Sequence, residues 1–201
     1  MSDFTVEVVG MLDVNCYLVP VAKSHRLYII DPGGDTEAVV AAAKKFTYDE
    51  AIILLSHAHV DHIGAVRDVA KALDISKVYL HKNDVSLYES PNNNLLPYIP
   101  TAEDLPKITA TIPGNDFEII ETPGHSPGGV CFYFKQIPAI FVGDTIFSNS
   151  VGRSDLPGGN HEQLISSIKN KLMTLPDDLR LYPGHGPATT VGNEKKFNPY
   201  L

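Results

Sequence analysis

Residues 51–62 read Ala-Ile-Ile-Leu-Leu-Ser-His-Ala-His-Val-Asp-His, an apolar run followed directly by four potential metal ligands. The apolar part predicts a short buried strand, and the polar part predicts the loop at its end. In an extended stretch, residues i and i+2 project the same way, so His57 and His59 can share one ion. Asp61 and His62 follow once the chain has begun to turn, so they can face a second ion. The stretch therefore predicts a metal site at a strand end.

Three further potential ligands occur in the same setting farther along the chain. His125 lies in Thr-Pro-Gly-His-Ser-Pro-Gly, Asp144 in Phe-Val-Gly-Asp-Thr and His185 in Tyr-Pro-Gly-His-Gly-Pro, each after a predicted strand. The neighbouring glycines let the backbone approach closely and adopt unusual angles. Because functional groups in open α/β architectures gather at strand ends, we expect these three residues to join the first four. The remaining histidines read as ordinary polar residues: His25, His81 and His161.

Strands and helices alternate along the rest of the chain. Besides 51–55, strands are predicted at residues 4–9, 14–19, 26–30, 77–81, 117–121, 130–134, 139–142 and 180–182, the first three as an antiparallel meander. Helices are predicted from Asp35 or Thr36 to Phe46, over 63–73 and 84–89, from a capping box at Asn160 to Met173, and at the C-terminus. Residues 91–113 are predicted to form a long surface loop. This alternation predicts an α/β fold of packed layers, and the length favours one domain over residues 1–201.

Three other polar residues could support the ligands. Asp31, before a Pro-Gly-Gly turn, has two readings: it orients a ligand histidine, or it satisfies backbone amides of its own turn. Ser56 and Thr145 lie next to ligands and could donate hydrogen bonds to them. Tyr88 and Tyr98 could reach a substrate, although packing at the surface is the simpler reading.

Composition excludes several classes of protein. The chain has 201 residues with 43% hydrophobic and 20% charged residues, and 16 basic against 24 acidic side chains give a net charge of −8. That charge disfavours nucleic-acid binding, and neither a membrane span nor a secretory signal is expected. Cys16 and Cys131 read as buried, reduced thiols, so we expect a cytoplasmic protein. We also expect a small-molecule substrate, no nucleic-acid or membrane partner, and a monomer or small homo-oligomer.

Four motifs in the order His-x-His-x-Asp-His, Gly-His-Ser-Pro-Gly, Gly-Asp-Thr and Pro-Gly-His-Gly resemble those of the metallo-β-lactamase superfamily. The later stretches resemble its compact bacterial glyoxalase II-like (hydroxyacylglutathione hydrolase-like) branch: Gly143-Asp-Thr-Ile-Phe, Val151-Gly-Arg-Ser-Asp-Leu-Pro-Gly-Gly and Gly184-His-Gly-Pro-Ala-Thr-Thr. The resemblance implies an αββα four-layer sandwich with a binuclear metal site between the edge loops of its two sheets.

The resemblance also implies a role for each ligand. The first metal would be held by His57, His59 and His125, the second by Asp61, His62 and His185, and Asp144 would bridge the two. Nitrogen and oxygen ligands without a thiolate suit two divalent ions, with zinc as the expected metal and iron or manganese as alternatives. Zinc β-lactamases usually have a cysteine at the position of Asp144, which disfavours β-lactam hydrolysis.

The implied reaction is hydrolysis of a thioester of the S-lactoylglutathione type. Two adjacent ions would share and acidify one water, and the bridging hydroxide would attack the carbonyl, which makes Asp61 and Asp144 catalytic. Full-length glyoxalase II has a C-terminal helical segment that supplies basic residues to glutathione, and we expect this chain, which ends at Leu201, to lack it. Arg153 could bind substrate in its place, or form a surface salt bridge.

Other functions are compatible with the same motifs. An iron-dependent persulfide dioxygenase would use one iron on His57, His125 and Asp144. A lactonase, phosphodiesterase or nuclease could use the same metal pair, although the acidic charge counts against a nuclease. A non-catalytic metal-binding scaffold would hold metal without turnover, and the complete ligand set counts against it.

Overall fold

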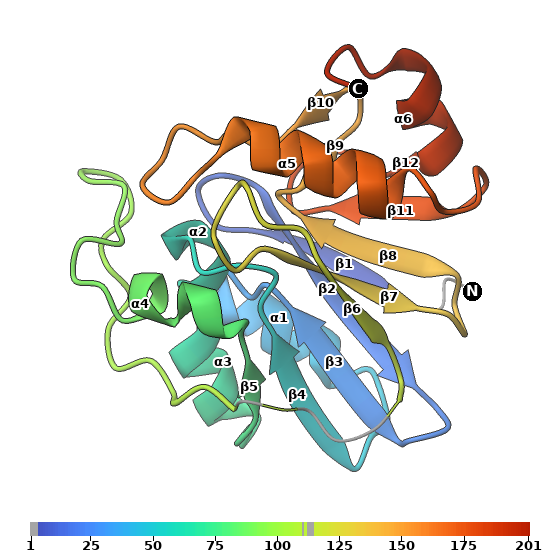
Figure 1. Cartoon of the computed structure of the whole chain (residues 1–201). Coiled ribbons are helices and arrows are strands. Elements are labelled where there is room, and N and C mark those ends of the chain that lie inside the picture. The colour runs from blue at the N-terminus through green and yellow to red at the C-terminus, as the bar shows by residue number, and fades with distance from the viewer. Residues whose placement is uncertain (1–3, 110, 112–114) are drawn as a thin grey trace. The chain divides into compact units, whose positions relative to one another are not determined.

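The computed structural model describes residues 4–109, 111 and 115–201, and it divides into two compact units, residues 1–114 and 115–201. Each unit has one five-stranded sheet, blue to green for the first and olive to red for the second in Figure 1. The prediction of one domain over residues 1–201 stays a prediction.

The sheet of the first unit contains β1 (Thr5–Val9), β2 (Val14–Val21), β3 (Arg26–Ile30), β4 (Glu50–Leu54) and β5 (Val78–Tyr79), side by side in that order. Strands β1 to β3 form the predicted antiparallel meander, whereas β3, β4 and β5 run parallel. Because parallel strands end at the same edge of a sheet, the turn after β3 and the histidine-rich loop after β4 lie next to each other.

A hydrophobic core lies between this sheet and two helices, α1 (Thr36–Ala43) and α3 (Val66–Ala72). Ile29 and Ile53 from the central strands belong to the same buried cluster as Val39 and Val69 from the helices. The alternate residues of these strands are buried too: Tyr28, Ile30, Ile52 and Leu54. A strand buried on both faces has no polar side to show, which explains the continuous apolar run that opens residues 51–62.

The helix predicted over residues 63–73 is present as α3, which begins later, at Val66, and a separate short helix, α2 (Val60–Ile63), precedes it. Between them, Ala65 donates its backbone N–H to the carbonyl of Pro32 at 3.0 Å. The segment between the two helices is therefore hydrogen-bonded to the turn that follows β3. Asp35, the predicted cap of α1, has no capping hydrogen bond in the described part of the chain and instead accepts one from the Gly10 N–H at 2.7 Å.

The remaining parts of the first unit are short. A 3₁₀ turn (Lys82–Asp84) and α4 (Val85–Tyr88) occupy the helix predicted at 84–89. The predicted loop 91–113 contains one isolated bridge, between Leu95 and Ile99. Residues 110, 112 and 113 of this prediction lie outside the described residues.

The sheet of the second unit has the order β12-β11-β8-β7-β6. Its strands are β6 (Glu118–Glu121), β7 (Val130–Phe134), β8 (Ala139–Gly143), β11 (Arg180–Pro183) and β12 (Thr189–Thr190). Helix α5 (His161–Ser167) and the π-helical turn Ile168–Leu172 share a buried cluster with Cys131, Ile140 and Leu181. Asn160 caps α5 as predicted, because its Oδ1 accepts the Gln163 N–H at 2.9 Å.

A small antiparallel ribbon of β9 (Ile146–Phe147) and β10 (Ser150–Val151) was not predicted. It is tied to the last helix, α6 (Val191–Phe197), by the buried carboxylate of Glu194. This carboxylate accepts hydrogen bonds from the Asn149 N–H at 2.9 Å and from Asn198 Nδ2 at 2.8 Å. Among the described residues, no helix is both long and apolar enough to cross a bilayer.

Candidate metal centre

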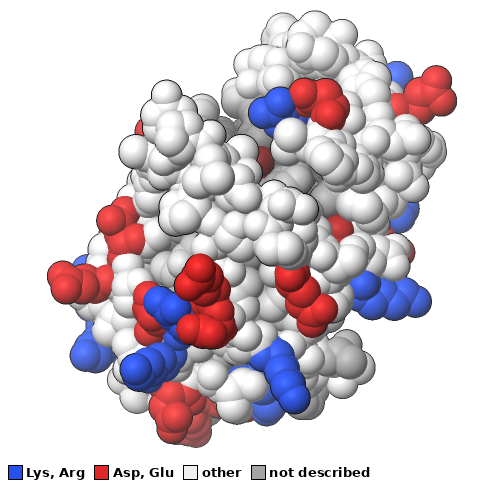
Figure 2. All heavy atoms as spheres, turned by 90° about the vertical axis from the view of Figure 1, so that its left-hand side faces the viewer, with Lys and Arg blue, Asp and Glu red and all other residues white. Residues whose placement is uncertain are grey.

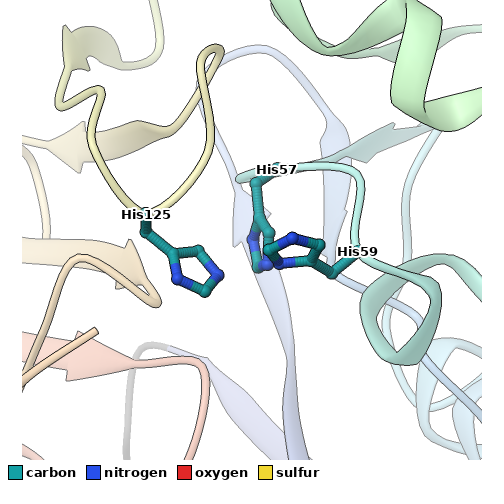
Figure 3. A group of neighbouring side chains, drawn as sticks. All are labelled: His57, His59 and His125. Atoms are coloured by element: carbon teal, nitrogen blue, oxygen red, sulfur yellow. The ribbon is translucent and has the colours of Figure 1, made fainter. Parts of the chain in front are cut away.

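The four predicted ligands of the first unit form one cluster, the first ligand group. Figure 3 shows the rings of His57 and His59 beside each other on the loop after β4. Their ring centroids are 4.8 Å apart, and the ring of His62 lies 4.2 Å from that of His57. Asp61 Oδ2 lies 3.8 Å from His62 Nε2. His57, Asp61 and His62 are buried, so the group is largely withdrawn from bulk water.

Two buried side chains hold the peptide between His57 and His59. Asp84 Oδ2 accepts the Ala58 N–H at 3.1 Å, and Asn93 Nδ2 donates to the Ala58 carbonyl at 2.7 Å. Neither residue was singled out in the sequence. The run Asn92-Asn93-Asn94 is the signal that could have drawn attention to Asn93, because asparagine side chains readily bond to backbone groups.

Asp31 connects the two buried histidines of this group. Its Oδ1 accepts the Ser56 N–H at 2.7 Å, and its Oδ2 accepts Ser56 Oγ–H at 2.6 Å and His62 Nδ1–H at 3.1 Å. Ser56 Oγ in turn lies 3.0 Å from His57 Nδ1. Because an ionised carboxylate only accepts, this network assigns the proton of both rings to Nδ1. Nε2 is then the lone-pair nitrogen that can bind a metal, so the structure favours the ligand-orienting reading of Asp31.

The three predicted ligands of the second unit form a second ligand group. Asp144 Oδ2 lies 3.7 Å from His125 Nε2 and 3.6 Å from His185 Nε2. His125 projects from the turn of the loop that follows β6 (Figure 3), while Asp144 and His185 follow the parallel neighbours β8 and β11. His125 Nδ1 lies 2.7 Å from the carbonyl oxygen of Arg153. A carbonyl can only accept, so His125 also carries its proton on Nδ1 and offers Nε2.

Two glycines make room for the backbone of the carboxylate ligands. A Cβ atom on Gly33 would lie 1.8 Å from the carbonyl oxygen of Asp61. A Cβ atom on Gly152 would lie 1.8 Å from the carbonyl oxygen of Asp144 and 3.3 Å from His125 Nδ1. Side chains at these two positions would therefore displace the ligands.

The donor chemistry of both groups fits divalent metal ions. Together the groups contain five imidazoles and two carboxylates, the nitrogen and oxygen donors that zinc, iron and manganese accept. The three His–Asp separations of 3.8, 3.7 and 3.6 Å are too long for hydrogen bonds. They approach the spacing of about 3.3 Å between two ligands that lie 2.0–2.1 Å from one tetrahedral ion.

The side chains of Arg153 and Thr145 form hydrogen bonds with residues outside the predicted ligand set. The Arg153 guanidinium donates two hydrogen bonds to Asp155, Nε to Oδ1 at 2.9 Å and Nη2 to Oδ2 at 2.7 Å. This pairing lowers the pKa of Asp155 to about 2 and matches the alternative reading of Arg153 as a surface salt bridge. Substrate binding by Arg153 stays a prediction. Thr145 Oγ1 pairs with Thr122 Oγ1 at 2.8 Å.

Comparison with known proteins gives matches over nearly the whole chain. The family model described as the metallo-beta-lactamase superfamily matches residues 9–185. Hydroxyacylglutathione hydrolase GloC of Haemophilus influenzae is 36% identical, over 93% of this chain and 92% of the relative. A crystal structure of BLEG-1 B3 metallo-beta-lactamase has a TM-score of 0.86 at 38% identity and covers 98% of this chain and 99% of its own. TTHA1623 in a di-iron-bound form has a TM-score of 0.84 at 38% identity, covering 98% and 100%.

Proposed function

This chain belongs to the metallo-β-lactamase superfamily and has its fold, as predicted. From that premise, we propose that the protein is a binuclear hydrolase of thioesters of the S-lactoylglutathione type. The family supports a metal-dependent hydrolase. The observation that carries the finer proposal is the second ligand group, in which one oxygen of Asp144 lies beside two imidazoles. The relative named hydroxyacylglutathione hydrolase supports the thioester substrate.

In the proposed site, His57, His59 and His125 would hold one ion, Asp61, His62 and His185 would hold the other, and Asp144 would be a ligand of both. Zinc is the proposed metal, and the relative in a di-iron-bound form keeps iron as an alternative. When bound, such ions supply Lewis acidity for a carbonyl oxygen and lower the pKa of water toward neutrality.

Neighbouring groups of the chain determine which ring nitrogen of the ligand histidines carries the proton, and the two carboxylates determine the charge of the site. Asp31 and Ser56 keep the proton of His57 and His62 on Nδ1, and the carbonyl of Arg153 does the same for His125. Asp61 and Asp144 contribute two negative charges, which partly balance two divalent ions and leave the site attractive to an anion. The leaving thiol has an ordinary pKa of about 8.5, so its thiolate can leave without a residue that acts as a strong acid to protonate it.

We also propose a small-molecule substrate, no nucleic-acid or membrane partner, and a monomer or small homo-oligomer in the cytoplasm. The net charge is −8, and acidic side chains are interspersed with basic ones on the face shown in Figure 2. A phosphate backbone would instead favour a continuous basic surface. Cys16 and Cys131 are buried and not in a disulfide, which suits a reducing compartment.

The proposal is tested by hydrolysis of S-lactoylglutathione after the metal-stripped protein is reloaded with zinc, manganese or iron. We expect two ions per chain in the wild type. For Asp144→Ala we expect a loss of at least about 100-fold in kcat, because losing even the hydrogen-bond partner of a ligand costs about 10- to 100-fold and Asp144 would itself be a ligand of both ions. Asp49→Ala is the matched control, since Asp49 is strongly exposed and belongs to neither ligand group. Undiminished turnover by an Asp144→Ala protein that still binds two ions would overturn the proposal.

A second candidate activity is β-lactam hydrolysis, which the expectation drawn from Asp144 disfavoured. The likeness to a B3 metallo-beta-lactamase at 38% identity favours it. The same metal-loaded samples should be assayed on a chromogenic cephalosporin, and faster cleavage of that substrate than of any thioester would make it the leading function. One iron per chain, with oxygen consumption on glutathione persulfide, would select the dioxygenase instead.

A further inference from the structure

The first unit contains a groove of about 680 Å³ whose lining includes the predicted ligand Asp61. One wall is the β1–β2 turn with Met11 and Leu12, and the other is the loop of residues 98–103, including Tyr98. We call it the Met11–Tyr98 groove. Its volume lies within the range of about 300–1,000 Å³ that is typical of small-molecule sites. A molecule in this groove would therefore reach the predicted ligand Asp61.

Large apolar side chains stand exposed on both walls of the groove. The exposed fraction is 66% for Met11, 45% for Leu12 and 71% for Tyr98. Ile99 and Pro100 continue the apolar wall beside Tyr98. Exposed apolar side chains that gather around one hollow, rather than standing singly, are typical of a binding surface.

The charged side chains of the groove do not suit an anion. Arg67 is the one cation among the described residues that line it, and its guanidinium is bonded to Asp68 at 2.9 Å and lies 3.7 Å from Asp104. Asp35 and Glu103 add negative charge to the same lining. A group with free carboxylates, such as glutathione, is therefore disfavoured here, whereas an uncharged chain is not.

Hydrogen bonding and close packing hold the wall in place. The Gly10 N–H, in the β1–β2 turn, donates to Asp35 Oδ2 at 2.7 Å. The turn sits directly on the loop after β3, because a Cβ atom on Gly34 would lie 2.7 Å from Gly10 Cα. A preformed wall binds a flexible ligand without the entropic cost of ordering the wall itself.

We propose that the Met11–Tyr98 groove binds the uncharged apolar acyl chain of the substrate, with the reacting carbonyl at the Asp61 end. The inference rests on the proposed function and specifies its substrate class as thioesters with an acyl chain of several methylene groups. The thiol carrier lies outside this groove. Burial of each methylene group is worth about 0.8 kcal/mol, which corresponds to about a fourfold gain.

The first experiment measures kcat/KM of the zinc-loaded protein on N-acetylcysteamine thioesters from acetyl to decanoyl. This neutral carrier leaves the acyl chain as the only variable. In the wild type, we expect kcat/KM to rise with chain length by up to about fourfold per methylene until the groove is full. The double variant Met11→Ser, Leu12→Ser should lose this rise with chain length. Val8→Ser is the control, because Val8 is 58% exposed on β1 and does not line the groove.

The second experiment measures binding of 1-octanol to the same zinc-loaded proteins by calorimetry, which requires no turnover. Wild type and Val8→Ser should bind it at least tenfold more tightly than the double variant. Equal octanol binding by all three proteins together with a flat chain-length profile would overturn the groove proposal, while acetyl turnover would preserve the proposed function. Octanol binding that is lost in the double variant, without hydrolysis of any thioester, would support the groove and overturn the thioesterase.

Discussion

At the scale of single residues, the protonation of the buried histidines is controlled by a carboxylate outside the predicted ligand set. Asp31 accepts hydrogen bonds from Ser56 and His62, and Ser56 passes the same preference on to His57. The backbone of Asp31 has a φ of 52°, a left-handed conformation in which asparagine and aspartate are enriched. One side chain at the end of β3 thus orients two rings that come from later in the chain.

Asp31→Asn should weaken metal binding by about 10- to 100-fold, the effect usually seen when the partner of a ligand histidine is lost. Asparagine keeps the left-handed backbone, but its amide nitrogen would face groups that themselves donate hydrogen bonds. The affinity for zinc would be measured by competition with a chromophoric chelator. Asp74→Asn is the matched control, because Asp74 is exposed and has a nearly identical φ of 53°. Equal affinities of the two variants would contradict the role of Asp31.

At the scale of elements, the ligands depend on how closely neighbouring segments approach. Gly33, in the turn after β3, packs closely against the backbone carbonyl of Asp61. In the same way, Gly152, directly after β10, packs closely against the backbone carbonyl of Asp144. Glu194 in α6 secures the second contact by holding the β9–β10 ribbon at Asn149. The position of a ligand is therefore set by an element that follows or precedes it by many residues.

Gly152→Ala should destabilise the protein by about 2 kcal/mol or more, because overpacking against backbone forces the chain to shift. The added Cβ would lie 1.8 Å from the Asp144 carbonyl oxygen, so bound zinc should fall as well. Urea unfolding and zinc content would be measured on the same samples. Gly192→Ala in α6 is the comparison variant. Its Cβ would meet Asp177 at 3.0 Å, a tight but less severe contact away from the ligands, so it should cost less stability than Gly152→Ala and leave bound zinc unchanged. Wild-type stability and zinc content in Gly152→Ala would refute this account.

At the scale of the whole molecule, each unit buries one thiol in its hydrophobic core. Burial raises the pKa of Cys131 to about 11, and it raises the pKa of Cys16 well above its ordinary value. In the unfolded chain a thiol ionises near about pH 8.5. Between that pH and about 11, the unfolded state loses protons that the folded state retains, so the free energy of unfolding must fall as the pH rises.

For Cys131, the fall between pH 8.5 and pH 11 should amount to about 3 kcal/mol. The measurement is urea unfolding of the wild type and of Cys131→Ala at several pH values in this range. Tyrosine and lysine titrations contribute to both proteins, so the difference between the two slopes isolates the thiol. Parallel pH profiles would contradict the prediction, because they would mean that the pKa of the Cys131 thiol is the same in the folded and the unfolded state.

Several features of this protein could be predicted from its sequence because they depend on nearby residues. The apolar run before His57, the meander of the first three strands and the Asn160 cap follow from periodicity and turn chemistry, and the structure has them. The break between α2 and α3 and the β9–β10 ribbon did not follow. Helical spacing continues through Gly64, and strands of two residues carry no period that a sequence can reveal.

The sequence by itself determined the fold family and the types of donor atoms that could hold a metal, since residue type, short spacing and strand-end position are local properties. Only the tertiary structure decided which nitrogen of His57, His62 and His125 carries the proton, and that the Arg153 guanidinium pairs with Asp155. It also revealed that Asp84 and Asn93 hold the ligand loop, and that Met11 and Tyr98 line one groove. Most of these contacts join residues 25 or more positions apart, and such partners are chosen by the path of the folded backbone rather than by local chemistry.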